Sequence, residues 1–391
     1  MLALALALRA RGHAVSFLVP DNFVAWVRAH QFEAIGNGID VRQLLHDAGA
    51  RVDSVRWQVR HFKDVMIPRL FASFAGAPDA DLIVGAGVQL AAASVAEARG
   101  VPFAMVGFCP CLVPSGSAPP PLIHSQWLPA WVNRAIWSVG RPVVDFALAR
   151  LLNRHRRALG LRADVEPLET ILSDRLIIAA DHDLAPLPDD APVRAAGTDA
   201  WVLDDEEALE PRVEHFLNAD PPPVYVGFGS MVAARAAELG RQAVAAVRAV
   251  GSRVLVAGGW AELDRHLAGD EDVLVAPSLP HAAVLPRVAA VVHHGGAGTT
   301  TAAARAGRPQ VLLPHILDQF YWARRIEVLG LGPSALPVSI VTADVLADRI
   351  DRAVNDPRIG SRAAAFGSMI AGRNGVDDAV ELLEAIVDCG A

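Results

Sequence analysis

Residues 291–301 contain a glycine-rich turn, with the sequence VVHHGGAGTTT. The apolar residues before the turn predict a buried strand, and the Thr- and Ala-rich residues after it predict a helix. Exposed N–H groups at such a helix start, aided by the helix dipole, bind phosphate, and glycines let the backbone approach it closely. His294 and the Thr299 hydroxyl can each add a hydrogen bond. The segment lacks the GxxxxGK[ST] pattern, so it is not a P-loop.

Two further glycine-containing segments also follow apolar runs. Gly229 and Ser230 come after residues 224–228, where they would contact the same phosphates or merely end a strand. Trp260 follows Gly258 and Gly259, where it would lie beside a nucleoside or pack as an ordinary core aromatic. Both interpretations stay open for each segment.

A fourth segment, residues 313–321, ends an apolar run in Pro314 and continues to Asp318 and Gln319 near a predicted helix start. Asp318 suits a helix N-cap. A carboxylate beside an amide that both donates and accepts also suits the paired hydroxyls of a sugar.

Short apolar runs alternate with helix-length segments along the chain, which is typical of parallel sheets covered by helices on both faces. Ligands of such sheets bind at the carboxyl ends of the strands, where the four segments above lie. The predicted strands are residues 14–19, 82–84, 103–106, 176–179, 224–228, 254–257, 273–276, 289–293 and 311–313.

The chain has 391 residues, enough for two domains. A Pro-rich and acidic stretch, residues 181–223, separates four predicted strands from five. We therefore predict an α/β protein of two doubly wound domains, residues 1–200 and 201–391. The last predicted helix, residues 377–387, either caps the second domain or packs back on the first.

The composition excludes several classes of protein. Hydrophobic residues make up 52% and charged residues 20%, which rules out disorder, and a net charge of −8 argues against nucleic-acid binding. No stretch of about 20 apolar residues predicts a membrane span. The apolar start, residues 1–8, has no preceding positive charge and is interpreted as a helix rather than a signal peptide. The three cysteines are expected to be small buried residues in a reducing cytoplasm.

The second half closely resembles the donor domain of the family 1 glycosyltransferases of the GT-B fold. The resemblance lies in HGGAGTT at residues 294–300, RAGRP at 305–309, and the stretch from Pro314 to Gln319. It is strongest toward bacterial natural-product and sterol or flavonoid enzymes, and it extends more weakly over the first half. It implies two Rossmann-like domains that face a cleft.

The family implies inverting transfer of a sugar from a UDP- or TDP-sugar to a hydroxyl of a lipophilic small molecule such as a polyketide, macrolide, flavonoid or sterol. It implies no metal and no other cofactor. The acceptor would contact Trp127 and Trp131, unless these tryptophans merely pack a helix. The implied donor-binding residues are Gly229, Ser230, Trp260, Leu279, Pro280, His294, Gly296, Ala297, Gly298, Thr299, Asp318 and Gln319.

The sequence departs from the family at two points. The family's catalytic base, His or Asp, precedes the first helix, and Met1 already stands at that helix, so no catalytic residue is assigned and the base is expected upstream. Ala302 stands where plant relatives have a Glu for the ribose, which favours a TDP-sugar. Two alternative functions stay open: a catalytically weak auxiliary protein that binds a sugar nucleotide, and a GT-B sugar-nucleotide epimerase. The oligomeric state also stays open, with a homodimer or an auxiliary partner protein as the arrangements considered. A Rossmann oxidoreductase is disfavoured because no GxGxxG opens the chain.

Overall fold

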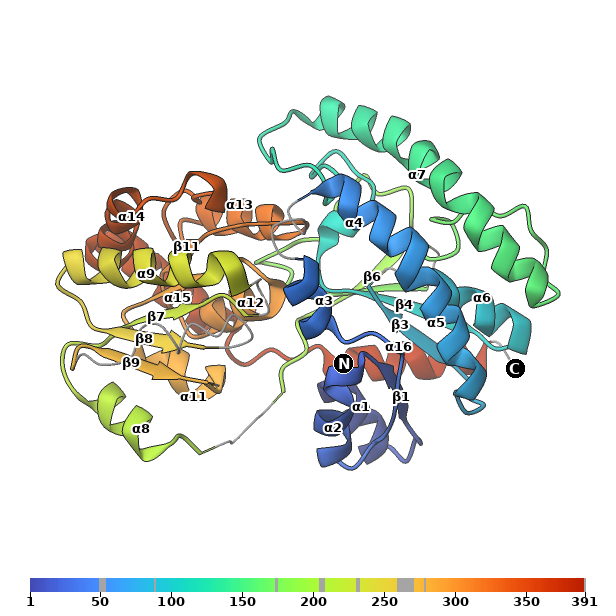
Figure 1. Cartoon of the computed structure of the whole chain (residues 1–391), viewed down its shortest axis with the longest axis horizontal. Coiled ribbons are helices and arrows are strands. Elements are labelled where there is room, and N and C mark those ends of the chain that lie inside the picture. Colours follow the sequence, from blue (N-terminus) through green and yellow to red (C-terminus); the bar gives the residue numbers. More distant parts are fainter. Residues whose placement is uncertain are drawn as a thin grey trace.

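The computed structural model describes residues 1–48, 54–87, 89–172, 175–203, 208–229, 233–258, 271–277 and 279–389. The chain folds into two lobes, both built on parallel sheets with helices packed against them (Figure 1). The predicted α/β class with two parallel-sheet halves is confirmed.

The first half contains two parallel sheets instead of the single predicted one. A two-stranded sheet pairs β1 with β2, and a four-stranded sheet has the order β3-β4-β5-β6. The strands are β1 (Ser16–Val19), β2 (Glu33–Gly36), β3 (Ile83–Ala86), β4 (Phe103–Gly107), β5 (Leu176–Ala179) and β6 (Ala195–Thr198). The helices are α1 (Leu2–Ala10), α2 (Asp21–Ala29), α3 (Val41–Ala48), α4 (Val55–His61), α5 (Ile67–Ser73), α6 (Leu90–Arg99) and α7 (Ala130–Ala158).

The second half contains one five-stranded parallel sheet with the order β11-β10-β7-β8-β9. Its strands are β7 (Val224–Gly227), β8 (Val254–Ala257), β9 (Val273–Ala276), β10 (Ala290–His293) and β11 (Gln310–Leu312). The helices are α8 (Pro211–Asn218), α9 (Ala233–Ala249), α11 (His281–Val284), α12 (Ala297–Arg305), α13 (Gln319–Leu329), α14 (Ala343–Asn355), α15 (Pro357–Ile370) and α16 (Val376–Asp388). Short 3₁₀ or π turns add η2 (Phe62–Met66), η3 (Phe74–Gly76), η4 (Pro110–Leu112), η6 (Leu285–Arg287) and η7 (Val338–Ile340).

The central strands form because their residues are apolar on both faces. Every residue of β5, β7 and β10 is buried, as expected for strands that have helices above and below them. One hydrophobic cluster spans both halves. It contains Leu312 and Trp322 of the second half together with Met105 and Leu184 of the first half. The two halves therefore share buried apolar surface.

Two strands were missed by the sequence analysis. Strand β2 (Glu33–Gly36) contains one β-branched residue, and β6 (Ala195–Thr198) reads Ala-Ala-Gly-Thr. Small residues have weak intrinsic strand preference, so only the pairing with β1 and β5 makes these segments extended. As a result, the Pro-rich stretch 181–223 is not a plain linker, because it contains β6 and α8.

The end of the chain returns to the first half. Helix α16 runs beside α1 (Figure 1), and its Ala379, Val380 and Leu383 pack in one cluster with Leu4 and Ile177. The turn before this helix lies close against the residues that follow β6 of the four-stranded sheet. A Cβ on Gly375 would meet the carbonyl oxygen of Asp199 at 2.1 Å.

The cysteines differ from the expectation of free thiols. Cys109 and Cys111 are buried as expected, but their sulfurs are joined in a disulfide across the short turn η4, while Cys389 is free and exposed. Within the part of the chain that the structure describes, no helix combines the length and the apolar character needed to cross a membrane.

The contact between α15 and α12 predicts opposite effects of two alanine substitutions in one helix. A Cβ on Gly367 would lie 2.6 Å from the Gly307 backbone, whereas a Cβ on Gly360 meets nothing within 4 Å. We expect Gly367→Ala to destabilise the fold by about 1–3 kcal/mol through overpacking. Gly360→Ala should stabilise it by up to about 1 kcal/mol, since Ala is the better helix former. Urea unfolding of both variants checks this, and equal effects would contradict the α12–α15 packing.

Candidate functional site

The carboxyl ends of the five strands of the second sheet lie along one edge, because all the strands are parallel. Strand β10 lies between β7 and β11. The segments that follow these three strands are therefore neighbours, and they carry the predicted phosphate turn, Gly229 and the Asp318–Gln319 pair.

His294 lies between two glycines that come from different strand ends. A Cβ on Gly229 would meet His294 Cε1 at 3.2 Å, and a Cβ on Gly296 would meet His294 Nε2 at 2.4 Å. Gly229 also has a φ of +57°, which a residue with a side chain rarely adopts. The imidazole thus occupies the space that two side chains would fill, and Nδ1 of His294 is buried with no hydrogen-bond partner among the described residues.

His293, the last residue of β10, is fully buried, and its hydrogen bonds fix the conformation of the turn. Its Nδ1 accepts the N–H of Gly295 at 3.1 Å, so its Nε2 carries the proton and donates to Gln310 Oε1 at 2.9 Å. Gln310 Nε2 in turn donates to the Thr300 carbonyl at 3.3 Å, and the Thr300 hydroxyl donates to the Gly296 carbonyl at 2.9 Å. Nothing in the sequence indicated this chain of hydrogen bonds, because Gln310 belongs to the neighbouring strand.

Both histidines of the turn are neutral at pH 7. Burial, with the neighbouring His294, lowers the pKa of His293 to about 3. Burial, with the neighbouring His281, lowers the pKa of His294 to about 4. The positive character of the turn therefore comes from the start of α12 and not from charged imidazoles.

Helix α12 presents its first N–H groups at this edge. Its N-cap is Gly296, which has no side chain to accept a hydrogen bond from the first turn of the helix. Gly298 is exposed, and Ala297 and Thr299 are half-buried. The first turn of α12 is thus reachable from solvent at the position where the sequence predicted a phosphate site.

Helix α13 begins directly against the turn. A Cβ on Gly295 would lie 3.1 Å from the Gln319 carbonyl oxygen. Gln319 Oε1 accepts the N–H groups of His315 and Ile316 at 2.7 and 3.1 Å, so this oxygen shapes the loop before the helix. Asp318 Oδ2 accepts from Trp322 Nε1 at 3.2 Å, and burial raises the pKa of the Asp318 carboxyl.

The remaining predicted donor residues lie farther along the edge or outside the described residues. Leu279 is buried and Pro280 caps α11, both following β9 at the other end of the sheet. Ser230 and Trp260 lie outside the described residues. The structure thus brings together Gly229, His294 and the starts of α12 and α13.

The first half faces α13 through the loop before α7. The Arg324 guanidinium lies 3.2 Å from the centre of the Trp127 ring, and His124 stacks on Phe320 with ring centres 4.0 Å apart. Trp131 is exposed on α7, and no described contact joins it to this group. The His124–Phe320 stack was missed, since two isolated aromatic residues give no signal in the sequence.

The fold and this edge define an α/β protein with two parallel-sheet halves and an uncapped helix start at the carboxyl edge of the second sheet. Residues 243–385 match the family described as erythromycin biosynthesis protein CIII-like, C-terminal domain. Vancomycin aglycone glucosyltransferase of Amycolatopsis orientalis is 39% identical over 84% of this chain and 80% of that protein. The dTDP-epi-vancosaminyltransferase of the same organism is 34% identical over 72% and 68%.

Among solved structures, glycosyltransferase VinC in complex with dTDP has a TM-score of 0.70 at 22% identity, over 100% of this chain and 96% of that one. This likeness shows the fold. The chain belongs to the family 1 glycosyltransferases of the GT-B fold, as its resemblance implied.

The buried histidines predict a specific loss of stability in acid. Their pKa values in the folded chain lie below the ordinary value of 6.5, so the unfolded chain binds more protons once the pH falls below about 6.5. His293 should then cost the folded state about 1.4 kcal/mol per pH unit. This loss should continue until the pH nears its folded pKa of about 3.

We expect His293→Asn to reduce the slope of unfolding free energy against pH by about this amount, measured by urea titration between about pH 6 and 4.5. His215→Asn, on the exposed face of α8, is the control for the removal of a histidine from the surface. A slope in His293→Asn equal to that of the unaltered chain would contradict the buried, neutral imidazole.

Proposed function

We propose that this chain transfers a sugar from a thymidine-diphosphate (TDP) sugar, or less readily a UDP-sugar, to a hydroxyl of a lipophilic natural product. The observation that carries the proposal is the neutral His294, held between Gly229 and Gly296 at the start of α12 and beside the start of α13. The names of the relatives support an antibiotic aglycone as acceptor and a TDP-sugar as donor.

In this proposal the donor diphosphate lies at the first turn of α12. Its oxygens accept hydrogen bonds from the backbone N–H groups of Ala297, Gly298 and Thr299. The imidazole of His294 donates one more. As the acceptor hydroxyl attacks the anomeric carbon, the bond from that carbon to the diphosphate oxygen breaks, and negative charge grows on the leaving diphosphate. Fixed N–H groups at a helix start stabilise such charge without having to reorganise.

The sugar would lie between this turn and α13. The Asp318 carboxylate keeps accepting capacity beyond its bond to Trp322, and the Gln319 amide lies next to it. The rest of the donor would contact five further residues. The diphosphate would meet Gly229 and Ser230, the base would meet Leu279 and Pro280, and the nucleoside would lie by Trp260. Trp127 and Trp131 would border the acceptor.

The proposal leaves the proton of the acceptor hydroxyl to a base that the chain does not identify, and it needs no metal ion or other cofactor. It places the reaction in the cytoplasm, the location expected from the sequence. A catalytically weak auxiliary protein and an epimerase have no observation of this structure in their favour.

The His294 assignment predicts weaker nucleotide binding when the imidazole is removed. A hydrogen bond to a charged group contributes about 1.5–3 kcal/mol, so His294→Ala should weaken TDP binding by about 10- to 100-fold. Isothermal calorimetry with TDP measures this, and His215→Ala on the exposed face of α8 is the control. Unchanged affinity in His294→Ala would overturn the diphosphate assignment.

The Asp318 assignment predicts an effect on the sugar alone. Asp318→Asn keeps the size of the side chain and an acceptor for Trp322, and it removes a buried carboxylate, so the fold should hold. We expect TDP-glucose to bind about 10-fold more weakly than to the unaltered chain, while the affinity for TDP changes little. Parallel losses for TDP and TDP-glucose would remove Asp318 from the sugar site.

A further inference from the structure

One loop of the first half holds both helices of the candidate donor site. Residues 181–185 follow β5 (Leu176–Ala179), at the carboxyl end of a strand of the four-stranded sheet. Arg305, the last residue of α12, binds the Asp181 carboxylate with Nε and Nη2. Arg325 of α13 donates from Nε to the Leu184 carbonyl at 2.7 Å. The two helices whose starts form the candidate site are thus anchored to the same five residues.

The Asp181–Arg305 pair is buried. Asp181 is fully enclosed, and the Arg305 side chain is 11% exposed. The distance from Arg305 Nε to Asp181 Oδ2 is 3.0 Å, and Asp181 Oδ1 also accepts the N–H of Ala200 at 3.3 Å. A buried, two-point pair of this kind fixes the geometry of its partners tightly, and removal of one partner leaves an unpaired buried charge.

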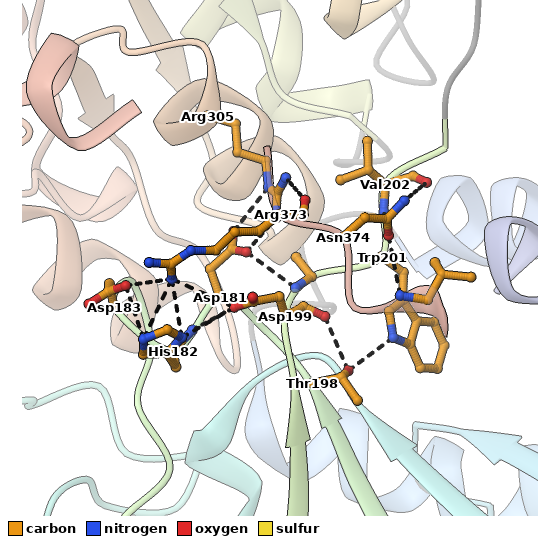
Figure 2. Close-up of polar contacts among 12 residues, drawn as sticks. Asp181, His182, Asp183, Thr198, Asp199, Trp201, Val202, Arg305, Arg373 and Asn374 are labelled. Carbon is orange, nitrogen blue, oxygen red and sulfur yellow. Dashed lines mark hydrogen bonds and ion pairs between the residues drawn. The ribbon is translucent and has the colours of Figure 1, made fainter. Parts of the chain in front are cut away.

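A second, more exposed layer surrounds this pair (Figure 2). Arg373, just before α16, binds Asp183, and its carbonyl accepts from Arg305 Nη1. His182 Nε2 lies 3.1 Å from Asp183 Oδ2, and His182 Nδ1 lies 3.3 Å from Asp199 Oδ1. Because exposed pairs contribute little, the enclosed Asp181–Arg305 pair is the part of this cluster that determines geometry.

The rigidity of the helices carries this constraint to the candidate site. Helix α12 spans Ala297–Arg305, about 13 Å, with the phosphate turn at one end and the anchored arginine at the other. Group transfer between two domains requires the acceptor oxygen to lie about 3–3.5 Å from the reacting carbon. A tilt of α12 or α13 against the first half would change that distance.

We propose that residues 181–185 set the orientation of α12 and α13 relative to the first half, with Asp181 and Arg305 as positioning residues for sugar transfer. The link from this orientation to sugar transfer rests on the proposed function. The orientation itself can be measured without a substrate.

The test compares two double variants in a Cys389→Ser background. Asp181→Asn with Arg305→Met removes the interdomain pair while keeping an acceptor for Ala200 and the volume of the arginine. Glu97→Gln with Arg156→Met is the control, since the Arg156 side chain is 1% exposed and binds the half-exposed Glu97 through two hydrogen bonds inside the first half. Replacement of both partners avoids an unpaired charge, so both double variants should fold. Arg305→Lys provides a milder variant.

Spin labels at Phe146→Cys on α7 and Val328→Cys on α13, both exposed positions, report the distance between the halves by pulsed electron resonance. We expect the distribution to broaden or shift in Asp181→Asn/Arg305→Met, to change less in Arg305→Lys, and to stay unchanged in the control. TDP affinity by calorimetry should stay within about threefold in all of them, because the site lies within the second half.

An unchanged distribution in the Asp181 and Arg305 variants, or equal broadening in the control, would overturn the positioning role. A loss of TDP affinity that parallels the broadening would also overturn it, because the pair would then support the site itself. Failure of the unaltered chain to bind TDP would instead contradict the proposed function, and the distance comparison would still decide the role of the loop.

Discussion

The candidate site depends on one constraint: a helix start must remain open to an anion while the strand before it is completely buried. Strand β10 has neighbours on both sides and helices on both faces, so its last residue, His293, cannot reach water. The chain must turn within His294, Gly295 and Gly296 and then begin α12 with uncapped N–H groups. Side chains on these glycines would collide with His294 or with α13.

Burial also determines the electrostatics of the turn. Two adjacent histidines would repel each other if both were charged, and their burial makes the charged forms more costly. The turn therefore presents backbone dipoles and neutral hydrogen-bond donors. Such a turn is polarised but uncharged, which suits the diphosphate of the donor in the proposed function.

Much of this arrangement could be predicted from the sequence, because the features are local. Apolar runs predicted nine strands to within two residues at either end, and the glycine-rich turn was expected at the end of one of them, where the structure has it. Asp318 and Gln319 were placed beside it by the parallel order of strands. Strands β2 and β6 escaped notice, since their small residues become extended only through pairing.

The remaining features depend on contacts between distant parts of the chain. Gln310 completes the hydrogen bonding of His293 from the neighbouring strand, and Asp181 meets Arg305 across 124 residues. Gln319 looked like a sugar ligand in the sequence, yet its Oε1 holds the backbone of residues 315 and 316. No pattern of spacing reveals such partners, because they are defined by how the two halves pack.

The most direct test of the account is a crystal structure of the chain with TDP bound in the presence of a chelator. The account predicts that the phosphate oxygens lie within hydrogen-bond distance of His294 and of the first N–H groups of α12, with no cation between them. A diphosphate bound elsewhere in the protein, or one that binds only through a divalent cation, would contradict it.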